Sequence, residues 1–138
     1  TELRSMQALG MEIGSHGCSH RRLPALDDLT LSRELTESRA ALEDILGAPV
    51  TSFAFPYGAV DARSKSAVRA AGYAAACTTQ SGWALHDHDA LSVRRLTVFS
   101  DDTADTLARK IALATNDASV VRIAKYACKR ALTRLVGQ

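Results

Sequence analysis

The sequence predicts an α/β fold in which helices and strands alternate around a parallel sheet. Helix-like and strand-like segments follow one another through short connections from residue 3 to residue 78, which is the pattern of βα units. The chain has 138 residues, 46% hydrophobic and 23% charged, which is enough for a domain with a core. Two motifs, at residues 13–20 and 53–58, each continue a short apolar segment. Chemistry in parallel α/β folds collects at the carboxyl ends of strands, where we expect both motifs.

The clearest element is a helix from Thr30 to Leu46. Its apolar residues recur at helical spacing and form one face: Leu31, Leu35, Leu42, Ile45 and Leu46. Gly47 and Pro49 end this helix, because glycine favours the C-cap and proline cannot continue a helix. Before it, we expect a helix over Leu3–Leu9 that stops at Gly10, a buried strand over Met11–Ser15 and a connector over Leu23–Asp28.

The later elements are expected in this order: a strand over Val50–Phe55, a helix over Asp61–Ala71, a strand over Tyr73–Thr78, a strand over Leu91–Phe99 and helices over Asp102–Thr115 and Val120–Val136. The last helix carries five cations and no acid, which leaves contact with a membrane surface or nucleic acid open. Because its apolar face is mostly alanine, we favour a helix docked on the domain with a solvated basic face, and no nucleic-acid partner.

The bulk composition points to no particular partner. The formal net charge is only +2, and no apolar run approaches the roughly 20 residues of a membrane-spanning helix. The three cysteines, Cys18, Cys77 and Cys128, lack the spacing of a metal finger, so we expect free, mostly buried thiols. The chain begins with Thr1, and we expect it to be a piece of a longer protein whose localisation and oligomeric state stay open.

His16 and His20 are the candidate metal ligands. They stand four residues apart in Ile13-Gly14-Ser15-His16-Gly17-Cys18-Ser19-His20, and a tight turn between them would aim both imidazoles at one point. Small residues surround both rings, and an apolar segment leads into the pair. Two histidines without a ligand are the alternative for this segment. A second metal patch at residues 86–89 is another candidate, although we favour a solvated polar loop there.

The segment Phe53-Ala54-Phe55-Pro56-Tyr57-Gly58 is the candidate catalytic turn. Proline and glycine punctuate many chains, so one interpretation is an ordinary β-turn. The functional interpretation is a rigid turn that directs a backbone N–H toward a reacting carbonyl, as in an oxyanion hole. Pro56 has no N–H, so the donor would be Tyr57 or a neighbour.

The order of these segments resembles the polysaccharide deacetylase family, the NodB-homology group of carbohydrate esterases. The resemblance extends from about Leu3 to Val98. Its points are, in order, residues 10–16 through His20, Leu23 and Leu26, Glu34 to Gly47, residues 53–58, Ala71-Gly72-Tyr73 with Thr78-Thr79, and Arg95-Leu96-Thr97-Val98. Several ordered motifs at fitting spacing are more specific than the histidine pair alone.

The resemblance implies a distorted (β/α) barrel, of which this chain would form the C-terminal part at residues 1–99, with a helical extension at residues 100–138. It implies a metal-dependent hydrolase that removes N-acetyl groups from a polysaccharide or amino sugar. A divalent metal, with zinc as the expected ion, would be held by His16, His20 and an aspartate. The backbone of Tyr57, preset by Pro56, would hold the oxyanion, and an N-acetylated carbohydrate would be the substrate.

The sequence departs from the family at three points. Nothing before Met11 matches the acidic motif that supplies the metal-ligand aspartate and the base, so we expect both upstream of this chain. Ala54 stands where many members have arginine, and the late Leu-x-His motif of the general acid is missing, because Leu85 and His86 are adjacent. Because the carboxylate ligand and the base are missing, we expect this segment to be inactive by itself.

Two interpretations of other classes stay open. One is a catalytically silent carbohydrate-binding or regulatory domain on the same fold, which the presence or absence of an upstream acidic motif would decide. The other is a basic interaction module that acts through residues 120–136, for which a steep salt dependence of binding would be the sign.

Overall fold

The computed structural model describes residues 1–84, 88–117, 119 and 121, and divides into two compact units. The first unit contains residues 1–79 and 84–94, and the second contains residues 80–83 and the described residues from 95 onward. The helix predicted over Val120–Val136 and the pair His86-Asp87 lie outside the described residues, apart from Val121 in the former. No described helix is both long enough and apolar enough to cross a membrane.

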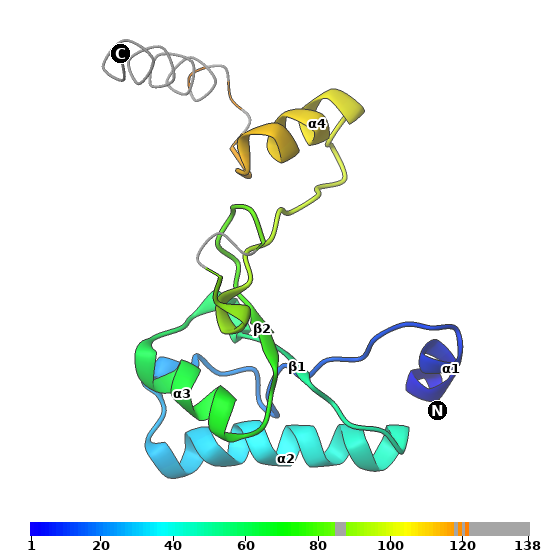
Figure 1. The fold of residues 1–138 in the computed structure, drawn as a ribbon, viewed down its shortest axis with the longest axis vertical. Helices are drawn as coiled ribbons and strands as arrows, with labels where there is room; N and C mark the ends of the chain where they lie inside the picture. Colours follow the sequence, from blue (N-terminus) through cyan, green and yellow to red (C-terminus); the bar gives the residue numbers. More distant parts are fainter. Residues whose placement is uncertain (85–87, 118, 120, 122–138) are drawn as a thin grey trace. The chain divides into compact units, whose positions relative to one another are not determined.

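The helices lie close to where the sequence predicts them (Figure 1). They are α1 (Glu2–Ala8), α2 (Asp28–Leu46), α3 (Ala62–Ala70) and α4 (Ala104–Leu113). Three short 3-10 helices among the described residues are η1 (Leu23–Ala25), η2 (Pro56–Gly58) and η3 (Ala90–Ser92). Helix α2 begins after Asp27, whose carboxylate accepts the amide of Thr30, and ends at Gly47 in a left-handed C-cap. Helix α3 begins with a capping box between Asp61 and Ser64.

A short parallel sheet organises the first unit. Strands β1 (Ser52–Ala54) and β2 (Ala75–Cys77) pair in parallel, with Phe53 opposite Ala76, and α3 connects them. Ser15 forms a parallel bridge to Phe53, and Val93 forms one to Cys77. Four chain segments therefore lie side by side in sequence order, which is the arrangement expected for consecutive (β/α) units. Within the described residues the sheet has two strands, extended by one isolated bridge on each side.

Two predicted strands are wrong over most of their length. In Met11–Ser15 only Ser15 pairs with β1, and Met11 is 51% exposed where a buried strand was expected. In Leu91–Phe99 the first residues belong to η3, only Val93 is bridged to β2, and Val98 and Phe99 are exposed. A strand needs a hydrogen-bonded neighbour along its length, and the central strands offer only three residues each.

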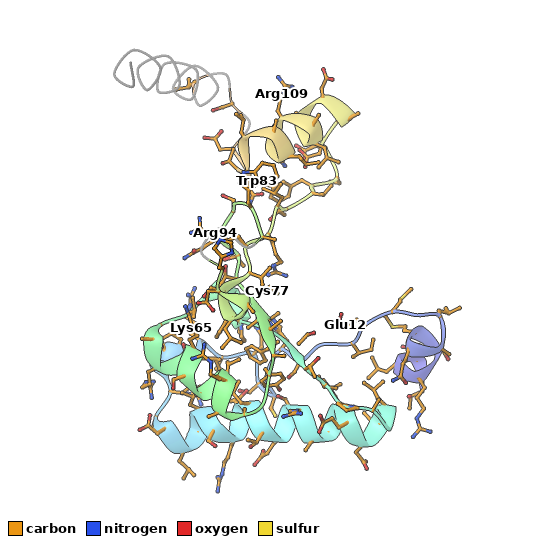
Figure 2. All side chains as sticks on the ribbon, in the orientation of Figure 1. Glu12, Lys65, Cys77, Trp83, Arg94 and Arg109 are labelled. Carbon is orange, nitrogen blue, oxygen red and sulfur yellow. The ribbon has the colours of Figure 1, made fainter. Side chains whose placement is uncertain are left out.

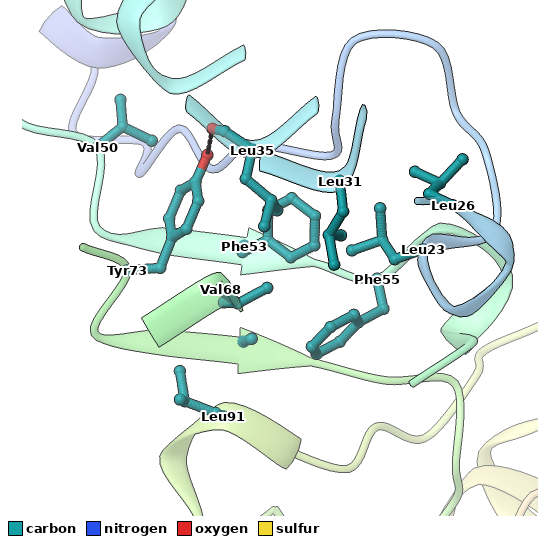
Figure 3. Packing of buried hydrophobic residues seen from close by; sticks show 11 residues of the cluster. Leu23, Leu26, Leu31, Leu35, Val50, Phe53, Phe55, Val68, Tyr73 and Leu91 are labelled. Atoms are coloured by element: carbon teal, nitrogen blue, oxygen red, sulfur yellow. Dashed lines mark hydrogen bonds between the residues drawn. The ribbon is translucent and has the colours of Figure 1, made fainter. Parts of the chain in front are cut away.

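The core of the first unit lies between α2, α3 and the sheet (Figure 3). Phe53 and Phe55 stand two residues apart, so they emerge on the same side of β1, with ring centroids 5.4 Å apart in an edge-to-face arrangement. Leu31 and Leu35 are buried against them from α2, and the hydroxyl of Tyr73 donates to the Leu35 carbonyl at 3.0 Å. The leucine face predicted for this helix is therefore confirmed: Leu31 and Leu35 are buried, and Leu42 and Leu46 are partly buried against the same core.

An ion pair joins α3 to the start of η3. Lys65 projects from α3 (Figure 2), and its Nζ lies 2.7 Å from a carboxylate oxygen of Asp89. The other carboxylate oxygen of Asp89 accepts the amide of Leu91 at 3.0 Å. Asp89 thus caps η3 and pairs with α3. These contacts give it a structural role, although the sequence also left it open as part of a second metal patch.

The second unit contains a buried ion pair. Lys110 of α4 is 4% exposed, and its Nζ lies 2.5 Å from Asp102 and 3.2 Å from the carbonyl oxygen of Thr97. The same ammonium lies 4.6 Å from the ring centroid of Phe99. The hydrogen bond from Lys110, followed by the amide of Phe99, lowers the pKa of Asp102. The sequence predicts a helix that begins at Asp102, but the N-cap of α4 is Thr103, so Asp102 lies just before the helix.

Candidate active site

His16 and His20 lie side by side immediately after the bridged residue Ser15. Their ring centroids are 4.8 Å apart, with the ring planes inclined by 60°. The Nδ1 atom of His16 lies 2.6 Å from the carbonyl oxygen of Ala54, the last residue of β1. A carbonyl only accepts hydrogen bonds, so Nδ1 is the protonated nitrogen of His16 and Nε2 of the neutral ring keeps its lone pair.

This hydrogen bond is of the kind that orients metal-binding histidines, in which one ring nitrogen donates to a backbone carbonyl and the other is left for the ion. The pair therefore fits a divalent metal as two nitrogen donors. No group of three or more His, Cys, Asp or Glu side chains suited to a metal occurs within the described residues. The assignment of His16 and His20 as ligands stays a prediction, and so does the third ligand.

Pro56 and Tyr57 follow β1 and approach the same place. Pro56 is buried, whereas Tyr57 is 55% exposed and adopts left-handed backbone angles, with φ 58° and ψ 11°. The Tyr57 ring centroid lies 4.6 Å from that of His20, and the guanidinium of Arg22 lies 4.7 Å from the Tyr57 centroid. Both sequence motifs thus come together, the histidine motif directly after the bridge residue Ser15 and the Pro56-Tyr57 turn directly after β1.

Two residues of this contact have unusual backbone conformations. His20 has φ 55° and Tyr57 has φ 58°, a region that non-glycine residues seldom occupy. Such strain persists where the surrounding structure holds it, and it is concentrated at functional sites. The rings of these two residues contact each other, so the strained positions belong to one local arrangement.

Gly58 allows the Pro56-Tyr57 turn to approach the chain after β2. A Cβ atom at Gly58 would lie 2.0 Å from Oγ1 of Thr79 and 2.6 Å from its backbone nitrogen. The φ of Gly58 is +64°, which is costly for other residues. The amide of Gly58 donates to the carbonyl of Phe55 at 2.8 Å, which closes the turn around Pro56 and Tyr57. Glycine is required here by both backbone and space.

The sequence-based assignment of the site missed two buried polar residues of α2. Glu34 is 8% exposed and Ser38 is 7% exposed. One carboxylate oxygen of Glu34 accepts the amides of Cys18 and Ser19 at 2.8 and 2.9 Å. Its other oxygen accepts the hydroxyl of Ser19. The signal was present in the helical pattern, because positions 34 and 38 lie on the same face as Leu31 and Leu35.

The hydrogen bonds of Glu34 favour its charged form. Burial, the largest influence, opposes ionisation, but the hydroxyl and amide of Ser19, the amide of Cys18 and the charge of Arg21 together lower the pKa of Glu34. Glu34 is therefore a carboxylate in the folded protein, inside an element that also supplies the leucine core.

Cys18 lies between the two histidines without joining them. Its Sγ atom is 3.8 Å from the carbonyl oxygen of Glu34, as expected for a residue that points away from the histidine pair. Both described cysteines are free, as predicted, but Cys18 is exposed rather than buried. Although the residue is exposed, partial desolvation of its thiol, followed by the charges of Glu34 and Glu37, raises the pKa of Cys18.

Comparison with known proteins identifies the family. Residues 1–76 match the family model described as polysaccharide deacetylase. The chain belongs to the polysaccharide deacetylase family. The resemblance inferred from the motifs is thereby confirmed, and the matched region includes both histidines and the Pro56-Tyr57 turn.

Solved deacetylases share the fold. A polysaccharide deacetylase from Bacillus cereus is 27% identical with a TM-score of 0.70, over 80% of this chain and 35% of that one. A protein from Bacillus anthracis that is assigned as a polysaccharide deacetylase is 27% identical with a TM-score of 0.68, over 77% of this chain and 34% of that one. A deacetylase from Streptococcus pyogenes in complex with acetate has a TM-score of 0.73 at 20% identity, over 78% and 47%.

The chain spans about a third of the length of the two Bacillus structures. The likeness to the streptococcal structure is evident in the fold alone, given its low identity. A comparison with curated protein sequences gave no match.

Proposed function

We propose that this chain contributes to a metal-dependent hydrolase that removes N-acetyl groups from a polysaccharide or amino sugar. The observation that carries the proposal is the adjacent pair of imidazoles, with His16 held by the Ala54 carbonyl, next to the Pro56-Tyr57 turn. Family membership supports the reaction class. The N-acetylated carbohydrate is proposed as the substrate because the family acts on such polymers.

In this proposal His16 and His20 hold a divalent ion, with zinc as the expected metal. An aspartate encoded upstream of Thr1 supplies the third ligand, and a second upstream carboxylate acts as the base. A bound divalent ion polarises the acetamido carbonyl and lowers the pKa of a water molecule. The Ala54 carbonyl keeps the proton of His16 on Nδ1, which leaves the lone pair of Nε2 for the metal ion.

Tyr57 contributes through its backbone in this proposal. Its amide is the first backbone N–H after Pro56. The buried proline presets the turn in which this amide lies. An N–H directed at the developing oxyanion stabilises the transition state more than the ground state. The exposed ring of Tyr57 contacts the ring of His20, and the guanidinium of Arg22 lies over the same tyrosine ring.

The proposal predicts metal-dependent acetate release. We expect the protein with its upstream segment to release acetate from an N-acetylated oligosaccharide, to lose this activity on exhaustive chelation and to regain it with Zn²⁺. The measurement is acetate formed per enzyme before chelation, after it and after readdition. Turnover that survives chelation would exclude the mechanism. Binding of the sugar without acetate release would favour the silent carbohydrate-binding domain instead.

A second prediction separates the backbone of Tyr57 from its hydroxyl. Tyr57→Phe keeps the amide and the ring, and a phenol with a pKa of about 10 is a poor base at neutral pH. We expect its turnover to fall only modestly. Pro56→Gly loosens the turn and should cost more, toward the roughly 10²–10³-fold typical of a lost oxyanion donor. If Tyr57→Phe is the more damaging change, the hydroxyl carries the chemistry.

A further inference from the structure

Helix α2 is hydrogen-bonded to the histidine loop, residues 15–20, at two positions that are one helical turn apart. Ser38 shares a hydrogen bond of 2.8 Å between hydroxyls with Ser15, the residue before His16. Glu34 accepts both amides and the hydroxyl available at positions 18 and 19, between the two histidines. Residues 34 and 38 are four apart, so both lie on the buried face of the helix.

The spacer between the histidines has no regular secondary structure of its own. Gly17 has φ +81°, and a Cβ atom at this position would lie 3.0 Å from Oε2 of Glu34. Backbone amides in such a spacer need acceptors when water is excluded from them. The Glu34 carboxylate supplies those acceptors, and charge-assisted hydrogen bonds are stronger than neutral ones. The absence of a side chain at Gly17 is what allows this close approach.

We infer that Glu34 is a positioning residue for the metal-ligand loop, which keeps the rings of His16 and His20 adjacent by fixing the Gly17-Cys18-Ser19 spacer against α2. The consequence for metal binding rests on the proposed function, whereas the ring geometry does not. Glu34 acts on the loop backbone and takes no part in the reaction. A pre-arranged pair of ligands binds an ion without first ordering the loop.

The test compares three variants with one matched control, all in the protein with its upstream segment. Glu34→Gln keeps the shape of the side chain but loses the charge and one acceptor. Ser19→Ala removes a single hydrogen bond at an exposed residue. Gly17→Ala crowds the carboxylate without altering it, and it also strains the spacer backbone, because Gly17 has φ +81°. The control is Glu37→Gln, an exposed carboxylate on the same helix that is also close enough to influence Cys18.

Three measurements are made on each protein: hydrogen exchange of the Cys18 and Ser19 amides, nuclear Overhauser contacts between the two imidazoles, and Zn²⁺ affinity by calorimetry. We expect Glu34→Gln and Gly17→Ala to speed exchange at both amides at least about tenfold and to lose the ring contacts. Their Zn²⁺ affinity should fall about 10–100-fold, as for lost outer-shell partners. Ser19→Ala should show smaller changes of the same kind, and Glu37→Gln should match the wild type.

Protected amides and intact ring contacts in Glu34→Gln, with the fold confirmed by circular dichroism, would overturn the inference. Loss of protection with unchanged ring contacts would also overturn it, because the spacer would then not position the rings. If the wild type shows the ring contacts but binds no Zn²⁺, the proposed metal site fails, and exchange and ring contacts still decide the role of Glu34. If Glu34→Gln does not fold, Ser19→Ala decides it, because this variant removes a hydrogen bond to Glu34 without straining the spacer backbone.

Discussion

His16→Ala should abolish acetate release by the protein with its upstream segment and remove most of its bound metal. The substitution deletes one of the two nitrogen ligands proposed for the metal and the hydrogen bond to the Ala54 carbonyl. Loss of outer-shell partners alone costs 10–100-fold in metal affinity, so loss of a ligand should exceed about 100-fold. His16 is a cleaner choice than His20, because His20 has φ 55° and alanine there would also strain the backbone.

His88→Asn is the matched control for this prediction. His88 is another exposed histidine of the first unit, with φ 53°, a conformation that asparagine tolerates. It should keep wild-type turnover and metal content, measured by acetate assay and by elemental analysis of the dialysed protein. Normal metal content in His16→Ala would remove this residue from the ligand set. An equal loss in both variants would show that the assay does not report on the histidine pair.

Gly58→Ala should be the most damaging single-methyl change in the catalytic turn. The new Cβ atom would lie 2.0 Å from Oγ1 and 2.6 Å from the backbone nitrogen of Thr79, so the turn has to move. The left-handed conformation costs alanine about 1–2 kcal/mol and overpacking about 1–3 kcal/mol more. We expect a loss of about 3 kcal/mol in the free energy of unfolding. Turnover should fall about 10²–10³-fold, because the Tyr57 amide is displaced.

Gly47→Ala separates strain from crowding. Gly47 has φ +65°, almost the same as Gly58, but a Cβ atom there has no heavy atom within 4 Å among its described neighbours. It should lose about 1 kcal/mol of stability and keep its turnover. Urea unfolding and acetate release, measured on both variants under conditions in which both are folded, make the comparison. Equal effects of the two substitutions would show that close packing against Thr79 does not hold the turn.

The sequence predicted the helices better than the strands, for a physical reason. Helix α2 carries its own signals, from the N-cap at Asp27 through the leucine face to Gly47, and these are local. A strand depends on a neighbour that is remote in sequence. The segment Leu91–Phe99 has a strand-like composition, yet only Val93 finds a partner in β2. Its other apolar residues could not reveal this by their spacing.

The sequence by itself determined the fold class through the alternation of its segments, and the family through a resemblance carried by the order of its motifs. It also determined the histidine pair and the proline-tyrosine turn, because these are encoded in residue types at short spacing. Only the tertiary structure decided how they are held. The Ala54 carbonyl that orients His16 lies 38 residues away from it, and the buried Glu34 that secures the spacer lies 15 and 16 residues from Ser19 and Cys18. A glutamate on a helix normally faces water, so the residue type favours a solvated side chain even though position 34 lies on the leucine face. Its burial follows from a loop that packs against the helix and brings two amides and a hydroxyl to the carboxylate. The helical pattern shows the face on which Glu34 lies, but it does not show this distant partner.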